Sequence, residues 1–270
     1  MTTINATLGS YPGLAFAAAM SRALADTHLA QTGHVQLCPQ NHGVLDAALD
    51  DLRDLSPATR YRLHANVRVE GHARHFDASH TGADADAYFR RLAEMSALLG
   101  ADAYTLHAGE RQGRPLEELF TRVRRLEDLM GIAVGVEGHY PEAGNKWWLS
   151  NWAEYAWLLA SGLDYALDLS HLNICAVRSG TVDLGLTREL LASEHCIEVH
   201  LSSNDGFSDL HCPLSLTPDI WWGPLLPHAN PAAVTFYEGN EMRGPGATER
   251  IQSRINQRRR APRPVDTRTQ

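Results

Sequence analysis

The stretch IEVHLSSNDGFSDLHCPL, residues 197–214, combines a strand with a metal-binding pattern. It begins as a short β-branched apolar run, which is typical of a buried strand, and His200 stands where the run turns polar. Asp209 and His211 follow in the loop at Asp-x-His spacing. Two imidazoles and one carboxylate are able to hold a divalent metal. A lone strand histidine is more often structural, so the interpretation depends on how the other strands end.

The rest of the chain alternates short apolar runs with helical patterns. We predict eight strands, at residues 4–10, 34–38, 62–67, 102–109, 132–138, 165–171, 197–203 and 233–239. We predict helices at residues 14–30, 44–55, 85–99, 115–130, 151–159 and 187–192. Such alternation indicates parallel strands joined by right-handed crossovers. Eight strands in 270 residues favour a closed (β/α)₈ TIM barrel. The rival, an open doubly wound sheet, wants a glycine-rich phosphate turn, and Gly9–Gly13 does not fit GxGxxG.

The two ends of the chain differ in composition. Residues 1–251 hold all eight predicted strands, and we expect them to form a single TIM-barrel domain. Residues 252–270 carry Arg258, Arg259 and Arg260, two prolines and no apolar periodicity. We expect them to be a basic, flexible tail, disordered or loosely docked, and not a domain.

Charge and cysteine usage exclude several classes of protein. The formal net charge is −8 and Lys146 is the only lysine, so nucleic acid is not an expected partner. The four cysteines show no CxxC spacing and no hydrophobic signal segment precedes them, so we expect reduced thiols in a cytoplasmic protein. No apolar run approaches the roughly 20 residues that span a bilayer.

Imidazoles and carboxylates recur where the predicted strands end. Because functional groups of a barrel gather at the carboxyl ends of its strands, we expect these side chains to share one mouth. The nine are His64, His107, Glu137, Asp168, His171, His200, Asp209, His211 and Glu238. At this density they would repel or titrate unless cations lay among them. We therefore predict two or three divalent ions, for which Zn²⁺, Mn²⁺ and Fe²⁺ all suit the mixed nitrogen and oxygen ligands.

An ordered set of short segments resembles the xylose isomerase-like TIM-barrel superfamily, which includes endonuclease IV and sugar phosphate isomerases and epimerases. The segments, from His64 to Glu238, are LHA, LHAGE, VEGHYP, DLSHLN, VHLSSNDGFSDLHCPL and FYEG. The resemblance to endonuclease IV implies that all nine positions bind a cluster of up to three metals. The resemblance to the simpler epimerases implies one ion on Glu137, Asp168, His200 and Glu238, with both glutamates moving protons.

The chain departs from this pattern in two loops. Many relatives have a Pro-Gly-Glu-Gly-like run after the position of His211, where this chain has PLSLTPD. After the fifth predicted strand it has HYPEAGNKWW in place of the asparagine- and glycine-rich loop of the DNA enzyme. These loops put the family's substrate in question, but not its metals.

We predict a metal-dependent isomerase or epimerase that acts on a sugar or related small hydroxy-carbonyl compound. Glu137 and Glu238 would be its proton-transfer residues. One alternative is a multinuclear non-haem iron oxidase, which shares the barrel and would modify a peptide or small molecule, with a peptide substrate or partner protein docked on it. A second is a phosphodiester hydrolase like endonuclease IV. Arg111, Arg114 and Arg178 are too few near the mouth to follow a nucleic acid backbone.

Overall fold

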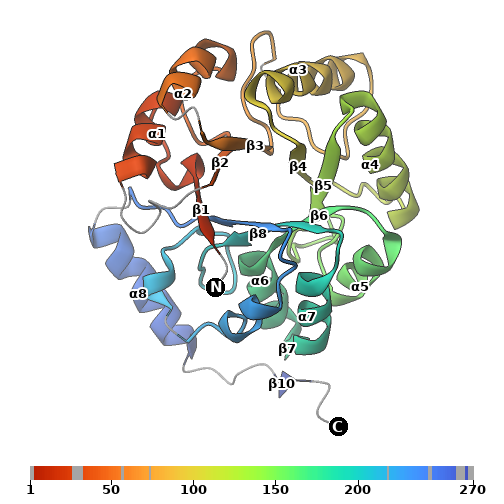
Figure 1. The fold of residues 1–270 in the computed structure, drawn as a ribbon. Helices are drawn as coiled ribbons and strands as arrows, with labels where there is room; N and C mark the ends of the chain where they lie inside the picture. The colour runs from red at the N-terminus through yellow and green to blue at the C-terminus, as the bar shows by residue number, and fades with distance from the viewer. Residues whose placement is uncertain are drawn as a thin grey trace.

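The computed structural model describes residues 3–25, 33–55, 58–72, 74–217, 219–242, 245–259 and 265–266. Eight parallel strands form a closed barrel in the order β1-β2-β3-β4-β5-β6-β8-β9, and β9 pairs with β1 (Figure 1). The predicted (β/α)₈ barrel is confirmed. The barrel strands are β1 Ile4–Thr7, β2 His34–Leu37, β3 Arg60–His64, β4 Ala103–His107, β5 Ala133–Glu137, β6 Tyr165–Asp168, β8 Cys196–Leu201 and β9 Val234–Tyr237.

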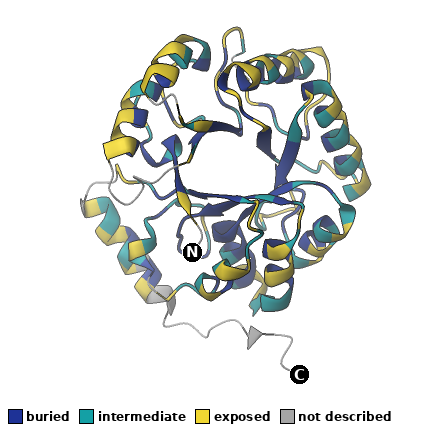
Figure 2. Cartoon of the chain, in the orientation of Figure 1, coloured by how far each residue is buried: buried dark blue, intermediate teal, exposed yellow. Residues whose placement is uncertain are grey.

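Helices surround the barrel and turn their exposed residues outward (Figure 2). They are α1 Phe16–Ala25, α2 Leu49–Leu55, α3 Ala83–Leu99, α4 Leu116–Met130, α5 Trp152–Ser161, α6 Leu169–Ser179, α7 Leu184–Ala192 and α8 Pro245–Arg259. Short 3₁₀ turns cover Leu8–Ser10, Leu45–Ala48, Leu214–Leu216 and Gly223–His228. Two two-residue strands, β7 Thr181–Val182 and β10 Val265–Asp266, pair with each other outside the barrel.

Helix α4 illustrates how the sequence fixes these elements. Its buried residues Leu119, Val123, Leu126 and Met130 recur at helical spacing and face the barrel. The helix ends at Gly131, whose φ of +68° is the left-handed conformation that glycine adopts without a steric penalty.

The sixth barrel strand is shorter than the sequence predicted, and a helix was missed. The prediction of a strand to residue 171 is wrong, because β6 ends at Asp168 and α6 begins at the next residue. The Asp168 carboxylate caps this helix by accepting hydrogen bonds from the backbone N–H groups of Ser170 (2.6 Å) and His171 (3.1 Å). His171 therefore lies in the first turn of a helix and not on a strand.

Helix α8 crosses the predicted boundary between residues 251 and 252. Its Ile251 and Ile255 are buried together with Cys212, so part of the expected tail packs onto the barrel domain. Of the residues after Arg259 the structure describes only Val265–Asp266. The division into a barrel and a flexible tail stays a prediction.

The four cysteines are free, and all are buried. None of the helices among the described residues has the length and apolar character that a bilayer crossing needs.

Candidate metal centre

All nine predicted residues lie at one mouth of the barrel, and we call them the mouth cluster. Strand register explains part of this. His107 is the register partner of Glu137, and Asp168 is the partner of His200, so these side chains leave adjacent strands at the same height. Contacts of 3.0–3.8 Å between ring nitrogens and carboxylate oxygens link all nine residues into one network. The sequence prediction that these residues meet therefore agrees with the structure.

Glu137 lies at the centre of the mouth cluster. Its Oε2 atom is 3.2 Å from His64 Nε2, 3.5 Å from His200 Nδ1 and 3.8 Å from His107 Nε2. Its Oε1 atom is 3.3 Å from His171 Nδ1. The side chain is 2% exposed, so these imidazoles replace water around the carboxylate.

His171 connects Glu137 to the loop after β8. Its Nδ1 atom lies 2.8 Å from the Gly138 carbonyl oxygen and donates a hydrogen bond to it. Its Nε2 atom faces Asp168 Oδ2 at 3.5 Å and Asp209 Oδ2 at 3.3 Å. Asp209 in turn lies 3.0 Å from His211 Nε2.

Glu238 follows directly after β9 and closes the ring of contacts. Its Oε1 atom is 3.5 Å from His200 Nδ1, and its Oε2 atom is 3.7 Å from His211 Nδ1. His211 has a φ of +43°, which is uncommon for a residue other than glycine. The backbone N–H of Asn240 donates a 2.8 Å hydrogen bond to its carbonyl oxygen. Such strain is often found at functional sites, where surrounding contacts hold it in place.

Burial and mutual contact shift the pKa values of the mouth cluster in both directions. Burial lowers the pKa of His64 well below its usual value. For His200 and His171, burial also lowers the pKa, but the surrounding carboxylates outweigh it and raise the pKa well above the ordinary value. Burial raises the pKa of Glu238 to about 7 although His200 and His211 lower it. The site thus holds charges whose balance depends on bound protons or other cations.

Several buried atoms of the mouth cluster have no hydrogen-bond partner among the described residues. They include Glu137 Oε2, Asp168 Oδ2 and His200 Nδ1. Buried carboxylate oxygens and ring nitrogens that face one another without a hydrogen bond cost free energy unless a proton or a metal ion lies between them. Ligand atoms of Glu137, Asp168 and His171, and likewise those of Asp168, His200 and Glu238, lie within 4.8 Å of one another. The donor set therefore fits divalent metal ions.

The barrel is similar to solved structures along nearly its whole length. A xylose isomerase domain protein from Alicyclobacillus acidocaldarius subsp. acidocaldarius is 14% identical, with 96% of each chain covered and a TM-score of 0.62. The 3-keto-D-glucoside 4-epimerase of E. coli is 11% identical (96% of this chain, 99% of that chain, TM-score 0.61). Endonuclease IV from Thermus thermophilus is 19% identical (89% of this chain, 93% of that chain, TM-score 0.54).

The chain has the fold of the xylose isomerase-like TIM barrels. The resemblance inferred from its short segments is confirmed at this level. No protein-family model matches the sequence, and no curated protein matches it. At such low identities the similarity shows the fold alone, because one barrel supports many unrelated reactions.

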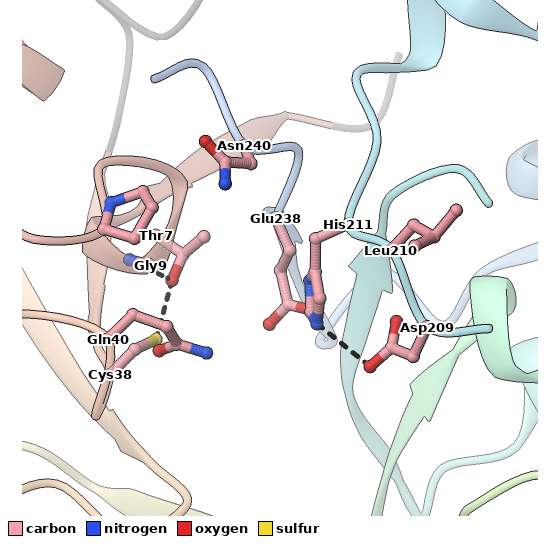
Figure 3. A pocket seen from close by; sticks show the side chains of 10 residues that line it. Thr7, Gly9, Cys38, Gln40, Asp209, Leu210, His211, Glu238 and Asn240 are labelled. Carbon is pink, nitrogen blue, oxygen red and sulfur yellow. Dashed lines mark hydrogen bonds and ion pairs between the residues drawn. The ribbon is translucent and has the colours of Figure 1, made fainter. Parts of the chain in front are cut away.

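Within this xylose isomerase-like barrel, a pocket of about 140 Å³ adjoins the mouth cluster (Figure 3). Asp209, His211 and Glu238 form one of its walls. The facing wall comes from the ends of β1 and β2 and from the chain after β9, with the residues Thr7, Gly9, Pro12, Cys38, Gln40 and Asn240. Among the described residues, no lysine or arginine lines it. Sequence reasoning missed this wall, because amide and hydroxyl residues in loops carry no metal-ligand signal.

Proposed function

We propose that this protein is a metal-dependent isomerase or epimerase that acts on a small hydroxy-carbonyl compound such as a sugar. The observation that carries the proposal is the position of Glu238, which belongs to the mouth cluster and also lines the pocket. A carboxylate that contacts both a metal site and a bound substrate is suited to proton transfer at the substrate.

The nine residues of the mouth cluster would hold two or three divalent ions such as Zn²⁺, Mn²⁺ or Fe²⁺. When bound, such ions would polarise the substrate carbonyl and make the neighbouring C–H bond more acidic. Glu238 would accept the proton of that C–H bond on one of its carboxylate oxygens and return it to carbon. Its burial supports this role, because a desolvated carboxylate is a stronger base than one in water.

Glu137 differs from Glu238 in its surroundings. It contacts four imidazoles and does not line the pocket. These contacts support a role as a metal ligand between ions. A second proton-transfer role for Glu137, on the opposite wall from Glu238, stays a prediction.

The pocket supports a small, uncharged polar substrate. The carbonyl oxygen of the Asn240 side chain accepts the backbone N–H of Met242 at 3.0 Å, so its amide nitrogen is left to donate to a ligand (Figure 3). Gln40 and Thr7 add further hydrogen-bonding groups on the same wall. The three mouth arginines have partners within the chain. Arg111 pairs with Glu154, Arg114 pairs with Glu118, and Arg178 donates to the Phe207 carbonyl oxygen at 3.2 Å. This favours a small molecule over nucleic acid.

The test measures metal and proton exchange together. Protein purified without chelator is analysed for bound metals and then incubated in D₂O with ketoses and aldoses, and deuterium at carbon is followed by NMR. We expect bound divalent metal, deuterium incorporation and product isomer. Glu238→Gln should keep metal and lose exchange by about 10²–10⁴-fold, the usual contribution of general acid–base catalysis. The proposal is wrong if the metal-loaded wild type exchanges no substrate proton.

A second candidate is a multinuclear iron oxidase. The observation that favours it is the size of the mouth cluster, because nine connected ligands exceed what one four- to six-coordinate ion takes. Two or three irons per chain with oxygen uptake on a peptide or small molecule, and no deuterium exchange, would select this function.

A further inference from the structure

A buried glutamate lies below the mouth cluster. Glu198 is in β8, two residues before His200, so both side chains point into the barrel. Its side chain is fully buried. No feature of the sequence distinguished it from the apolar run in which it stands, and the proposed reaction does not use it.

Both carboxylate oxygens of Glu198 are occupied by neighbours. Its Oε2 atom lies 3.0 Å from Thr105 Oγ1, 3.1 Å from His200 Nε2 and 3.2 Å from Gln36 Nε2. Its Oε1 atom lies 3.3 Å from Arg62 Nη1. We call Gln36, Arg62, Thr105 and Glu198 the interior network. The Thr105 hydroxyl and the Gln36 amide nitrogen donate to Oε2, because a carboxylate oxygen accepts hydrogen bonds.

The direction of these hydrogen bonds determines where two histidines carry their protons. Because Thr105 Oγ1 uses its proton on Glu198, it must accept from His64 Nδ1, 2.9 Å away. His64 Nε2 then carries a lone pair directed at Glu137 Oε2. Likewise, His200 donates its Nε2 proton to Glu198, so Nδ1 is the nitrogen left for a metal. Gln36 Nε2 also lies 3.0 Å from His200 Nε2, but a lone pair on that ring nitrogen would face the Glu198 carboxylate oxygen at 3.1 Å, so the proton belongs on Nε2.

We propose that Glu198 is a positioning residue that selects the metal-binding nitrogen of both His64 and His200, directly for His200 and through Thr105 for His64. This inference rests on the proposed metal centre. Hydrogen bonds from metal-binding histidines to carboxylates are a general means of fixing the tautomer and ring orientation. Here a single oxygen, Glu198 Oε2, would fix the tautomers of both His64 and His200. The two rings are arranged edge to face, with their centroids 4.8 Å apart.

Two other roles of Glu198 fit the contacts less well. Glu198, His64 and His200 have ligand atoms within 4.8 Å of one another, as a metal site would. However, Arg62 beside the carboxylate repels a cation, and the hydrogen bonds already occupy both oxygens. A purely structural role would require only the pair with Arg62 on Oε1. It would not require Oε2 to accept from the residues that orient two ligands.

The experiment compares isosteric variants by metal affinity and by the visible absorption spectrum of the Co²⁺-loaded protein. In Glu198→Gln, the new amide can donate to His200 Nε2 and so move the ring proton to Nδ1, where the metal would bind. We expect a loss of Co²⁺ and Mn²⁺ affinity on the order of 10–100-fold and a changed Co²⁺ spectrum. Thr105→Val removes the hydroxyl that connects Glu198 to His64 but leaves the contact between Glu198 and His200, so it should give a smaller change of the same kind. Thr235→Val is the control, because its buried hydroxyl has no hydrogen-bond partner in the part of the chain that the structure describes.

Each outcome decides the proposal. If Glu198→Gln binds Co²⁺ with unchanged affinity and spectrum while the wild type binds normally, Glu198 is not a positioning residue. Loss of one whole ion, with the spectrum of the others unchanged, would make Glu198 a ligand and also overturn it. If Glu198→Gln does not fold, Thr105→Val against Thr235→Val carries the same test. A wild type that binds no divalent ion would overturn both this proposal and the proposed function.

Discussion

Two buried polar groups of residues lie one above the other in this barrel, and they differ in how well they are satisfied. In the interior network, Glu198 accepts bonds on both oxygens, and Arg62 forms ion pairs with Glu198 and with Asp102, although its Nε, 2.8 Å from Asp102, makes no hydrogen bond of good geometry among the described residues. In the mouth cluster, the ligand atoms Glu137 Oε2 and His200 Nδ1 face each other at 3.5 Å, and neither has a hydrogen-bond partner in the described part of the chain. The difference teaches that burial of polar residues does not by itself indicate a metal site. A metal site is indicated where buried ligand atoms converge and lack hydrogen-bond partners.

The largest expected effect comes from the centre of the mouth cluster. Glu137→Gln removes the charge that four imidazoles surround, so we expect loss of bound metal and a fall in turnover of about 10²–10⁴-fold. The barrel should stay folded, because an amide has the same size as the carboxylate. Metal analysis, deuterium exchange and circular dichroism check this. Full metal content with full turnover would refute the assignment of Glu137.

Mutation of the interior network should lower the free energy of unfolding, whereas mutation of the mouth cluster should lower metal binding and turnover. Arg62→Met leaves Glu198 buried without its cation, and breaking a buried ion pair in this way costs about 3–5 kcal/mol. Urea unfolding of the metal-free protein measures it. The control is Arg91→Met, whose partly exposed pairs with Asp46 and Glu94 should contribute less than about 1 kcal/mol. If both substitutions lowered the free energy of unfolding equally, the buried ion pair of the interior network would contribute no more than the surface pairs of Arg91.

Metal binding should stabilise the folded protein through the mouth cluster and not through the interior network. A ligand that binds only the folded state stabilises it by about 2.7 kcal/mol at a concentration 100 times its dissociation constant. We expect added Mn²⁺ to stabilise the wild type by this amount, and Glu137→Gln by much less. Urea unfolding at several Mn²⁺ concentrations measures both. Equal stabilisation of the two proteins would place the ion outside the mouth cluster.

The sequence predicted the mouth cluster and missed the interior network for one physical reason. Strand ends show a visible change from apolar to polar residues, and parallel strands bring those ends together, so His107, Glu137 and Asp168 could be placed without coordinates. Glu198 and Thr105 stand inside their strands, where alternation alone does not say which face points into the barrel. The helix after Asp168 was missed although an aspartate before a helical run is an N-cap signal. The polar lining of the pocket carried no such signal.

The smallest expected effect is a pH dependence of the metal-free protein. Burial lowers the pKa of His211, but Asp209 and Glu238 outweigh it and raise the pKa to about 10 from an ordinary 6.5. The proton thus stabilises the fold, fully below pH 6.5, and this contribution is lost as the pH rises through about 10. Between these pH values we expect the melting temperature of chelator-treated protein to fall more steeply in the wild type than in His211→Gln. The difference should be at least about 2–4 °C, the shift that each 1 kcal/mol causes in a protein of this size, because one unit of raised pKa corresponds to about 1.4 kcal/mol. His195→Gln, in the loop before β8 at the other end of the barrel, controls for loss of a histidine. Parallel curves for wild type and His211→Gln would mean that Asp209 and Glu238 do not hold this proton.

Bound metal should abolish the difference in melting temperature between wild type and His211→Gln, because a coordinated imidazole nitrogen carries no proton.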